Sequence, residues 1–342
     1  MSEPDLIEVA RGGDERAYER LVEPHRAELL AHCYRMLGSA HNAEDALQEA
    51  LLRAWRGLPK FEGRSSLRSW LYTITTNASL KAIRRRPKRV LPIDYGPPAD
   101  PHDGPGQPII ESVWVEPYPD ERLALDDALA GPEARYEQRE SIELAFIAAL
   151  QHLPARQRAV LILRDVLGFS AREVAHALDT TPGSVDSALQ RAHKTVDERL
   201  PEQSQQATLR ALGDEGLREI VNEFVAAWER ADIDAVVAML GDDATLTMPP
   251  LPTWYQGREA VAAFLKGWPL AGTAPRRMVP TRANGQLAFG HYTWDAGEET
   301  FISHAIHVLT LDGATIAEIT AFLTPEAFER FSLPDKIKPL ER

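Results

Sequence analysis

Two neighbouring segments near the start of the chain combine a polar helix face with aromatic and cationic side chains. In residues 42–56, small apolar side chains recur at helical spacing, which predicts one buried stripe beside an exposed polar face. A second segment carries Trp70 and Tyr72, and it ends in three consecutive arginines at 84–86. Aromatic rings stack on unpaired bases, and guanidinium groups bind phosphates. The two segments therefore indicate a helix that binds a partner protein and a surface that binds opened nucleic acid.

The charge of the chain is distributed in blocks. The net charge of −13 over 342 residues would by itself argue against a protein that binds nucleic acid. Residues 53–89, however, contain eleven Lys and Arg and one acid, whereas residues 94–143 contain thirteen Asp and Glu and three Arg. Phosphates would therefore be attracted to the first domain and repelled by most of the remaining chain.

Composition divides the chain into successive domains. Residues 1–90 and 134–200 show helical periodicity. Between them, residues 91–133 are rich in proline, glycine and acids, which is typical of a partly extended linker. A short polar connector over residues 201–214 leads to the last domain, residues 215–342.

The last domain changes from a helical to a strand-like pattern. Two amphipathic helical stretches come first, and alternating runs follow at 287–294, 300–311 and 315–323. Helices that precede a curved antiparallel sheet make an α+β domain. The predicted fold class is therefore multi-domain, with two all-α domains followed by an α+β domain.

The second helical block contains a helix-turn-helix pattern. Residues 170–173 form a capping box, and Thr181 with Pro182 starts the next helix. From Val185 onward, apolar residues recur at spacing i, i+4, i+7 and i+11, which predicts the buried face. The opposite face offers hydroxyl, amide and cationic groups that can bind base edges and phosphates. These residues are Ser184, Ser187, Gln190, Arg191 and Lys194.

The order of these motifs resembles bacterial sigma factors of the extracytoplasmic-function (ECF) group. Residues 42–86 resemble sigma region 2, and the helix-turn-helix resembles region 4. The resemblance implies a cytoplasmic protein without a membrane segment, whose partners are core RNA polymerase and promoter DNA. Region 2 would bind the polymerase and open the −10 element, and region 4 would read the −35 element. No cofactor or metal is implied, and whether an anti-sigma factor controls the protein is left open.

The resemblance also implies the residues of each site. The polymerase would be bound by Asp45, Gln48, Glu49, Leu52 and Arg53. The flipped base and the phosphates of the −10 element would be bound by Phe61, Arg64, Ser65, Ser66, Trp70, Tyr72, Asn77, Arg84, Arg85 and Arg86. The −35 element would be read by the helix-turn-helix face already named. Asp186 departs from the family, which often has basic residues in this stretch, so a sequence preference cannot be carried over.

The last domain resembles the SnoaL-like, or nuclear-transport-factor-2-like, cone, some members of which are enzymes. Side chains that could serve a pocket are Trp254, Tyr255, Asp242, His291, Tyr292, Trp294, His304 and His307. Because His304 and His307 differ by an odd number of positions, a regular strand would point at most one of them into the cone. No acid and base have a spacing that marks a catalytic pair. The domain is therefore predicted to be a regulator rather than an enzyme, and a small-molecule ligand is left open.

Two further segments are predicted to be regulatory. Trp114 and Pro117 are apolar residues in a polar linker, which indicates a segment that docks on a domain. Near the end of the chain, a run resembles a Pro-Asp-Lys motif of sigma factors with this extension. Its residues are Leu333, Pro334, Asp335 and Lys336.

Several function classes are excluded or disfavoured. The single cysteine, Cys33, excludes an intrachain disulfide and a cysteine-cluster zinc site. The chain has no glycine-rich phosphate loop. Two alternatives to a sigma factor are a fused isomerase-type enzyme and a dimeric, ligand-responsive helix-turn-helix repressor. The repressor leaves the motif at residues 42–56 without a role.

Overall fold

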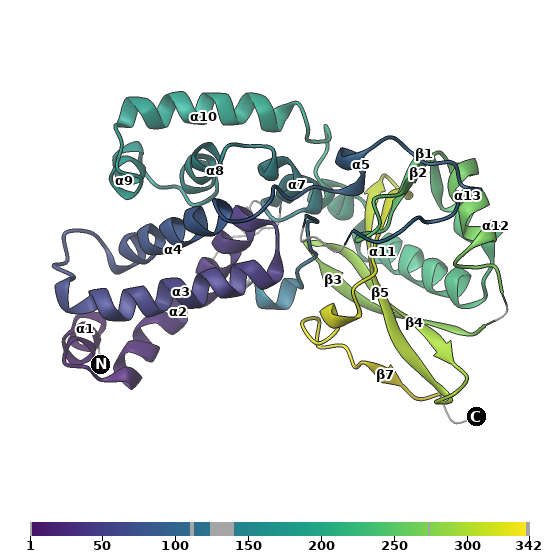
Figure 1. Ribbon diagram of the computed structural model, residues 1–342, viewed down its shortest axis with the longest axis horizontal. Helices are drawn as coiled ribbons and strands as arrows, with labels where there is room; N and C mark the ends of the chain where they lie inside the picture. Colours follow the sequence, from purple (N-terminus) through teal and green to yellow (C-terminus); the bar gives the residue numbers. More distant parts are fainter. Residues whose placement is uncertain (1, 110–112, 124–139, 273, 340–342) are drawn as a thin grey trace. The chain divides into compact units, whose positions relative to one another are not determined.

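The computed structural model describes residues 2–109, 113–123, 140–272 and 274–339 (Figure 1). It consists of two compact units. Unit 1 contains Met1–Arg89 and Arg122–Leu200, and unit 2 contains Val90–Glu121 and Pro201–Arg342. Most of the segment predicted to be a linker is therefore part of unit 2.

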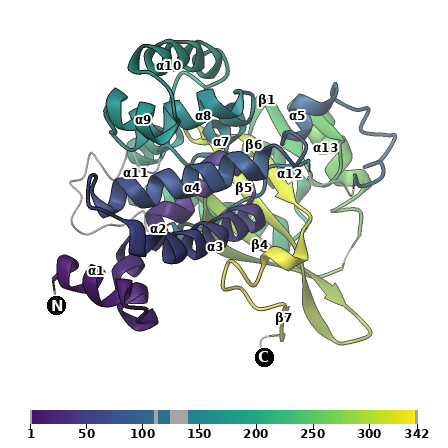
Figure 2. The same cartoon turned by 60° about the vertical axis from the view of Figure 1, so that its left-hand side comes forward.

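Unit 1 is built from two helical segments of the chain, which are separated in sequence by residues of unit 2. Its first part contains α1 (Glu3–Arg11), α2 (Glu15–Leu37), α3 (Ala40–Gly57), the 3-10 turn η1 (Leu58–Lys60) and α4 (Leu67–Ile83). Its second part contains α7 (Leu144–Gln151), α8 (Ala155–Leu161), the π-helical turn η3 (Ile162–Val166), α9 (Ala171–Ala177) and α10 (Pro182–Asp197). Helices α2, α3 and α4 contact one another, and α8, α9 and α10 lie on the α4 side of this group in both views (Figures 1 and 2).

Local capping explains where these helices begin and end. The side chains of Asp14, Ser39 and Ser66 accept hydrogen bonds from backbone N–H groups in the first turns of α2, α3 and α4. Gly38 ends α2 in the left-handed conformation at φ 62°. Pro24 lies inside α2 without breaking it.

The predicted helix-turn-helix is confirmed in detail. Ser170 and Glu173 form a reciprocal capping box at the start of α9. Thr181 caps α10, and Pro182 is its first residue. The apolar face of α10 is buried at Val185, Ala192 and Val196, and Leu189 of the predicted face is half-buried.

Unit 2 is an α+β domain. Its helices are α5 (Pro92–Tyr95), the 3-10 turn η2 (Asp120–Arg122, which ends in unit 1), α11 (Gln205–Glu229), α12 (Ile233–Ala238), α13 (Arg258–Gly267) and the turn η4 (Pro325–Ala327). Its strands are β1 (Leu240–Thr247), β2 (Trp254–Gln256), β3 (Arg276–Ala283), β4 (Gln286–Asp295), β5 (Thr300–Asp312), β6 (Thr315–Phe322) and β7 (Lys336–Ile337).

The seven strands form one mixed sheet. The order is β2-β1-β6-β5-β4-β3, and β7 pairs with β5. The pair β1–β6 is parallel and the other pairs are antiparallel, which corrects the expectation of a purely antiparallel sheet. Edge strand β3 has no counterpart among the predicted runs, because Pro280 within it is a weak strand former that an edge position tolerates.

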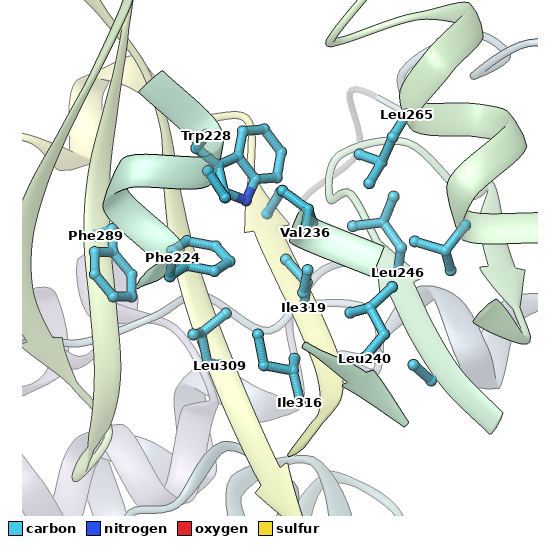
Figure 3. Close-up of a cluster of buried hydrophobic side chains, with 14 of the residues drawn as sticks. Phe224, Trp228, Val236, Leu240, Leu246, Leu265, Phe289, Leu309, Ile316 and Ile319 are labelled. Carbon is cyan, nitrogen blue, oxygen red and sulfur yellow. The ribbon is translucent and has the colours of Figure 1, made fainter. Parts of the chain in front are cut away.

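The core of unit 2 lies between one face of the sheet and the helices. Phe224 and Trp228 of α11 pack over Phe289 of β4, and Val236 of α12 extends the cluster (Figure 3). Helix α11 begins at Gln205 and bends at Gly213, whose φ is 66°. The segment predicted as a connector is therefore mostly the first part of this helix.

A β-bulge changes the direction of side chains in β5. The pairing of β4 with β5 shifts between His291 and Tyr292, which face Ala305 and Ser303, so His304 is the extra residue. As a result, the rings of both His304 and His307 lie beside His291, with centroids 5.2 and 5.1 Å away. Of the pair, only His307 is buried, and His304 is exposed, although the bulge brings both rings beside His291.

Candidate functional site

The exposed face of α3 carries the side chains predicted to bind a polymerase. Ala46, Leu47, Ala50 and Ala54 are buried, as the helical spacing predicts. Asp45 and Gln48 are exposed, and the apolar side chain of Leu52 is 52% exposed.

Ion pairs order the edge of the α3 face. Glu49 accepts hydrogen bonds from Arg53 at 2.5 Å and from Lys81 of α4 at 2.9 Å. The bond from Lys81 lowers the pKa of the Glu49 carboxyl. Arg86 lies 3.6 Å from Asp45. All these groups are partly exposed, so the pairs orient side chains more than they stabilise the fold.

The loop before α4 and one side of α4 carry most of the predicted −10 set. Residues 64–66 and Asn77 are exposed, and Trp70 is half-buried. The ring of Phe61 is buried against Trp70, with ring centroids 4.9 Å apart. Trp70 and Asn77 are seven residues apart, so they lie on one side of the helix.

Tyr72 does not lie with them. It is 1% exposed, and its hydroxyl donates to Glu28 Oε2 at 3.1 Å. Its ring contacts His32 and Phe169, each with centroids 5.3 Å apart. Burial raises the pKa of this phenol. The structure therefore does not bring Tyr72 to the surface that presents Trp70.

The basic residues and the helix-turn-helix face are exposed. Arg84, Arg85 and Arg86 follow the end of α4 and are all exposed. On α10, the five residues predicted to read DNA are exposed on the side opposite the buried face. Only Ser184 of these is drawn into capping, where its backbone N–H donates to Thr181 Oγ1 at 3.3 Å.

Two buried arginines join the halves of unit 1. Arg158, 5% exposed, donates to the carbonyl of Met36 at 2.5 Å and to the side chain of Gln151 at 2.6 Å. Arg35 donates to the carbonyl of Ser141 at 3.1 Å and to its hydroxyl at 2.7 Å. Burial lowers the pKa of both guanidinium groups to about 10. The sequence held no signal for either role, because the partners are distant in the chain.

Unit 2 binds the linker through two side chains that the sequence suggested only as pocket residues. Trp254 Nε1 donates to the carbonyl of Gly96 at 2.8 Å. The hydroxyl of Tyr255 donates to the carbonyl of Gly104 at 3.1 Å. Both side chains thus hold linker backbone. Asp242, a further pocket candidate, instead lies at the surface beside Arg258, 3.1 Å away.

The predicted linker residues lie in this docked segment. Trp114 and Pro117 are buried, and the ring of Trp114 contacts Tyr95 at 5.4 Å. Nearby, the backbone N–H of Tyr118 donates to the Asn284 side chain and its carbonyl accepts from the Asn284 N–H, both at 3.0 Å. The linker is thus attached to the β3–β4 turn as well as to β2.

Gly104→Ala should release the linker from unit 2. A methyl group there would meet the ring of Trp268 at 2.6 Å, and the residue has φ +81°, which disfavours alanine. We expect faster hydrogen exchange across residues 96–106. Gly96→Ala is the matched control, because that position is extended and has no atom within 4 Å of the added methyl. Unchanged exchange in Gly104→Ala would show that this contact does not hold the segment.

The C-terminal tail is part of the sheet of unit 2. The backbone N–H of Ser303 donates to the carbonyl of Asp335 at 2.9 Å, and the hydroxyl of Tyr292 donates to that of Pro334 at 2.9 Å. Leu333 packs against Gly290, where an added methyl would come within 2.7 Å of it. Lys336 forms an ion pair with Glu298. The predicted motif is therefore anchored by backbone pairing.

A polar cluster lies inside unit 2. Among the described residues, both ring nitrogens of His291, Nδ1 of His307 and the indole N–H of Trp228 are buried without a hydrogen-bond partner. Burial lowers the pKa of His307 to about 3 and that of His291 well below its usual value. These imidazoles are therefore neutral near pH 7, and the cluster makes the core sensitive to acid.

Three parts of the chain match known protein families. Residues 21–89 match the Sigma-70 region 2 family, residues 143–196 match Sigma-70 region 4, and residues 221–319 match the SnoaL-like domain family. The chain is 40% identical over 328 residues to the ECF RNA polymerase sigma factor SigG of Mycobacterium tuberculosis, covering 96% of this chain and 86% of SigG. It is 29% identical over 195 residues to the RNA polymerase sigma-H factor of Pseudomonas aeruginosa, covering 57% of this chain and 92% of that protein.

The fold is similar to a solved structure. The crystal structure of the Mycobacterium tuberculosis ECF sigma factor SigJ matches with a TM-score of 0.56 at 21% identity, covering 90% of this chain and 97% of that chain. No helix in the described part of the chain is long and apolar enough to span a membrane. Sigma domains and a SnoaL-like domain thus occur together here as part of a transcription regulator rather than an enzyme. The chain belongs to the ECF family of RNA polymerase sigma factors.

Proposed function

We propose that this sigma factor docks on core RNA polymerase through the α3 face, captures −10 DNA with the loop at residues 61–66 and Trp70, and reads the −35 element with α10. The observation that carries the proposal is that α3 and α10 each present an exposed polar face beside a buried apolar one. Arg84, Arg85 and Arg86 would bind phosphates beside the melted bases, because they are exposed at the end of α4. The site of action is the cytoplasm.

We further propose that unit 2 regulates the sigma domains by holding the linker. The −10 and −35 elements are about 25 base pairs apart, or about 85 Å at about 3.4 Å per pair, so the two DNA-binding domains must separate on a promoter. A linker attached at Gly96, Gly104 and Tyr118 restricts that separation. Release of the linker would then accompany formation of the active complex.

Changing Asp45 and Gln48 together to alanine should weaken binding to core polymerase. Both side chains are exposed, so the fold should be unaffected. Loss of two central interface contacts should lower the affinity on the order of tenfold or more. The measurement is a titration of labelled sigma factor with core enzyme. The control changes Glu198 and Glu202 together to alanine, because both are exposed and lie outside α3. Equal affinity of the double variant and the wild type would show that core polymerase does not bind through these two side chains.

Ending the chain after Arg330 should change promoter-dependent transcription. This truncation removes β7 and Leu333, so it exposes the face of β4 and β5 on which the tail lies. Ending the chain after Leu200 removes unit 2 except its linker part, and it should abolish regulation altogether. Both chains can be compared with the full chain in reconstituted transcription. Full-length rates from both truncated chains would argue that unit 2 does not regulate.

A further inference from the structure

Helix α9 of the helix-turn-helix lies against the first half of α4 (Figure 2). The ring of Phe169, just before α9, meets the Tyr72 ring edge-on at 67°. The guanidinium carbon of Arg68 lies 4.9 Å from the centroid of the Tyr72 ring and 5.5 Å from that of Phe169. Phe169 is 7% exposed, so this contact is a closed aromatic and cationic cluster.

A cleft of about 390 Å³ lies between α9 and part of the surface proposed to bind −10 DNA. One wall contains Arg64 and Ser65 of the capture loop together with Tyr72. The opposite wall is formed by α9, including Arg172 and Glu173. Three residues predicted to bind the −10 strand therefore share this cleft with a helix of region 4.

Glu173 places an anionic group in this cleft. Its carboxylate accepts a weak hydrogen bond from the Ser69 hydroxyl at 3.5 Å. Its hydrogen bonds with Ser170 lower the pKa of the carboxyl, so it is ionised near pH 7. Phe169 supplies an aromatic ring in the same cluster. A bound nucleotide would place an aromatic base and an anionic phosphate in this cleft. Phe169 and Glu173 supply the same two kinds of group.

The contact between α9 and α4 is incompatible with promoter binding at both elements. Region 2 and region 4 must lie about 85 Å apart along the DNA if each occupies its element. In unit 1, side chains of α4 and α9 touch. The contact has to break before both elements are bound.

We propose that α9 with Phe169 and Glu173 is an internal competitor of the −10 single strand: in the free chain it forms one wall of the cleft at Arg64 and Ser65 and covers Tyr72, and the strand and α9 exclude each other. This inference rests on the proposed −10 site. Only molecules in which α9 has left α4 can bind the strand, and we call their share the open fraction. The apparent affinity is the intrinsic affinity multiplied by the open fraction, so a weaker α9 contact gives tighter binding. Binding of region 4 to polymerase or to the −35 element would therefore favour −10 capture.

The test measures affinity for a fluorescently labelled single strand that carries a −10 element selected from a promoter library with the holoenzyme. Full-length Phe169→Ala should bind it about two- to tenfold more tightly than the wild type, because loss of the aromatic pair raises the open fraction. Glu173→Gln should act in the same direction with a smaller gain. Glutamine can replace glutamate in the capping box, so α9 should remain folded in Glu173→Gln. The variant therefore tests the effect of the negative charge alone.

Glu202→Gln is the charge-matched control, because Glu202 is exposed and lies outside the residues that line the cleft, so this change should leave the affinity unchanged. The inference is overturned if Phe169→Ala and Glu173→Gln both bind the strand with wild-type or weaker affinity. This holds provided that the wild-type chain directs transcription from the selected promoter. Absence of core-dependent transcription by the wild type would instead remove the proposed function, and this inference with it.

Discussion

Acidification from pH 7.5 to pH 5 should strongly destabilise unit 2. His291 and His307 are buried, and desolvation is the main cause of their depressed pKa values. A base with a depressed pKa in the folded state stabilises the fold above its unfolded pKa of about 6.5, and the stabilisation is lost as pH falls toward the folded pKa. For His307 this window runs from about 6.5 to about 3. Protonation of His307 should lower the free energy of unfolding by about 2 kcal/mol at pH 5, and His291 should add to this loss.

Urea unfolding at the two pH values measures this loss. His291→Leu should remove part of the acid sensitivity at little cost near pH 7, because neither ring nitrogen of His291 has a hydrogen-bond partner among the described residues. The exposed His102 provides the control His102→Gln, which should keep the wild-type pH dependence. An unchanged acid slope in His291→Leu would show that this imidazole is not held neutral. His32, with its pKa lowered to about 3 by burial, should make unit 1 acid-sensitive by a similar amount.

Arg158→Met should lower the free energy of unfolding of unit 1 by about 3–5 kcal/mol. The guanidinium satisfies the carbonyls of Met36, Gln151 and Leu153, and methionine would leave them buried and unpaired. Because Met36 belongs to α2 and Arg158 to α8, the change also loosens region 4 from region 2. For a unit of this size, the melting temperature should fall by about 10 °C.

Calorimetry of the full chain can assign the affected transition. Arg172→Met is the matched control, because Arg172 is exposed on α9. It should melt within about 1–2 °C of the wild type, as surface changes usually do. Arg158→Lys keeps the charge but loses the fork of donors, so it should lie between the two. If Arg158→Met melts like the control, the buried hydrogen bonds do not hold the two helical halves together.

Features that depend on neighbouring residues were predictable from the sequence. The capping box at Ser170 and Glu173, the cap at Thr181 and the end of α2 at Gly38 each depend on groups a few positions apart. The exposed face of α10 follows from the same periodicity. The motif order was sufficient to indicate the sigma family, because each motif is contiguous in the chain.

Some local patterns were misleading because neighbouring strands changed them. His304 lies on the same side as His307 since the pairing of β4 and β5 shifts by one residue. Pro280 hid an edge strand that pairs with β4 along its whole length. Neither feature is encoded in one strand alone, because a register belongs to a pair of strands.

The sequence by itself determined the helices, their caps, the helix-turn-helix and the family of this protein. Tertiary structure alone decided that Tyr72 is buried by Phe169, that Trp254 and Tyr255 hold the linker, and that the tail pairs with β5. Tyr255 and its partner Gly104 are 151 residues apart in the chain. The physical reason is that helical hydrogen bonds and caps connect residues within about four positions. Burial and docking depend instead on which distant surfaces meet, and one strand or helix does not carry that information.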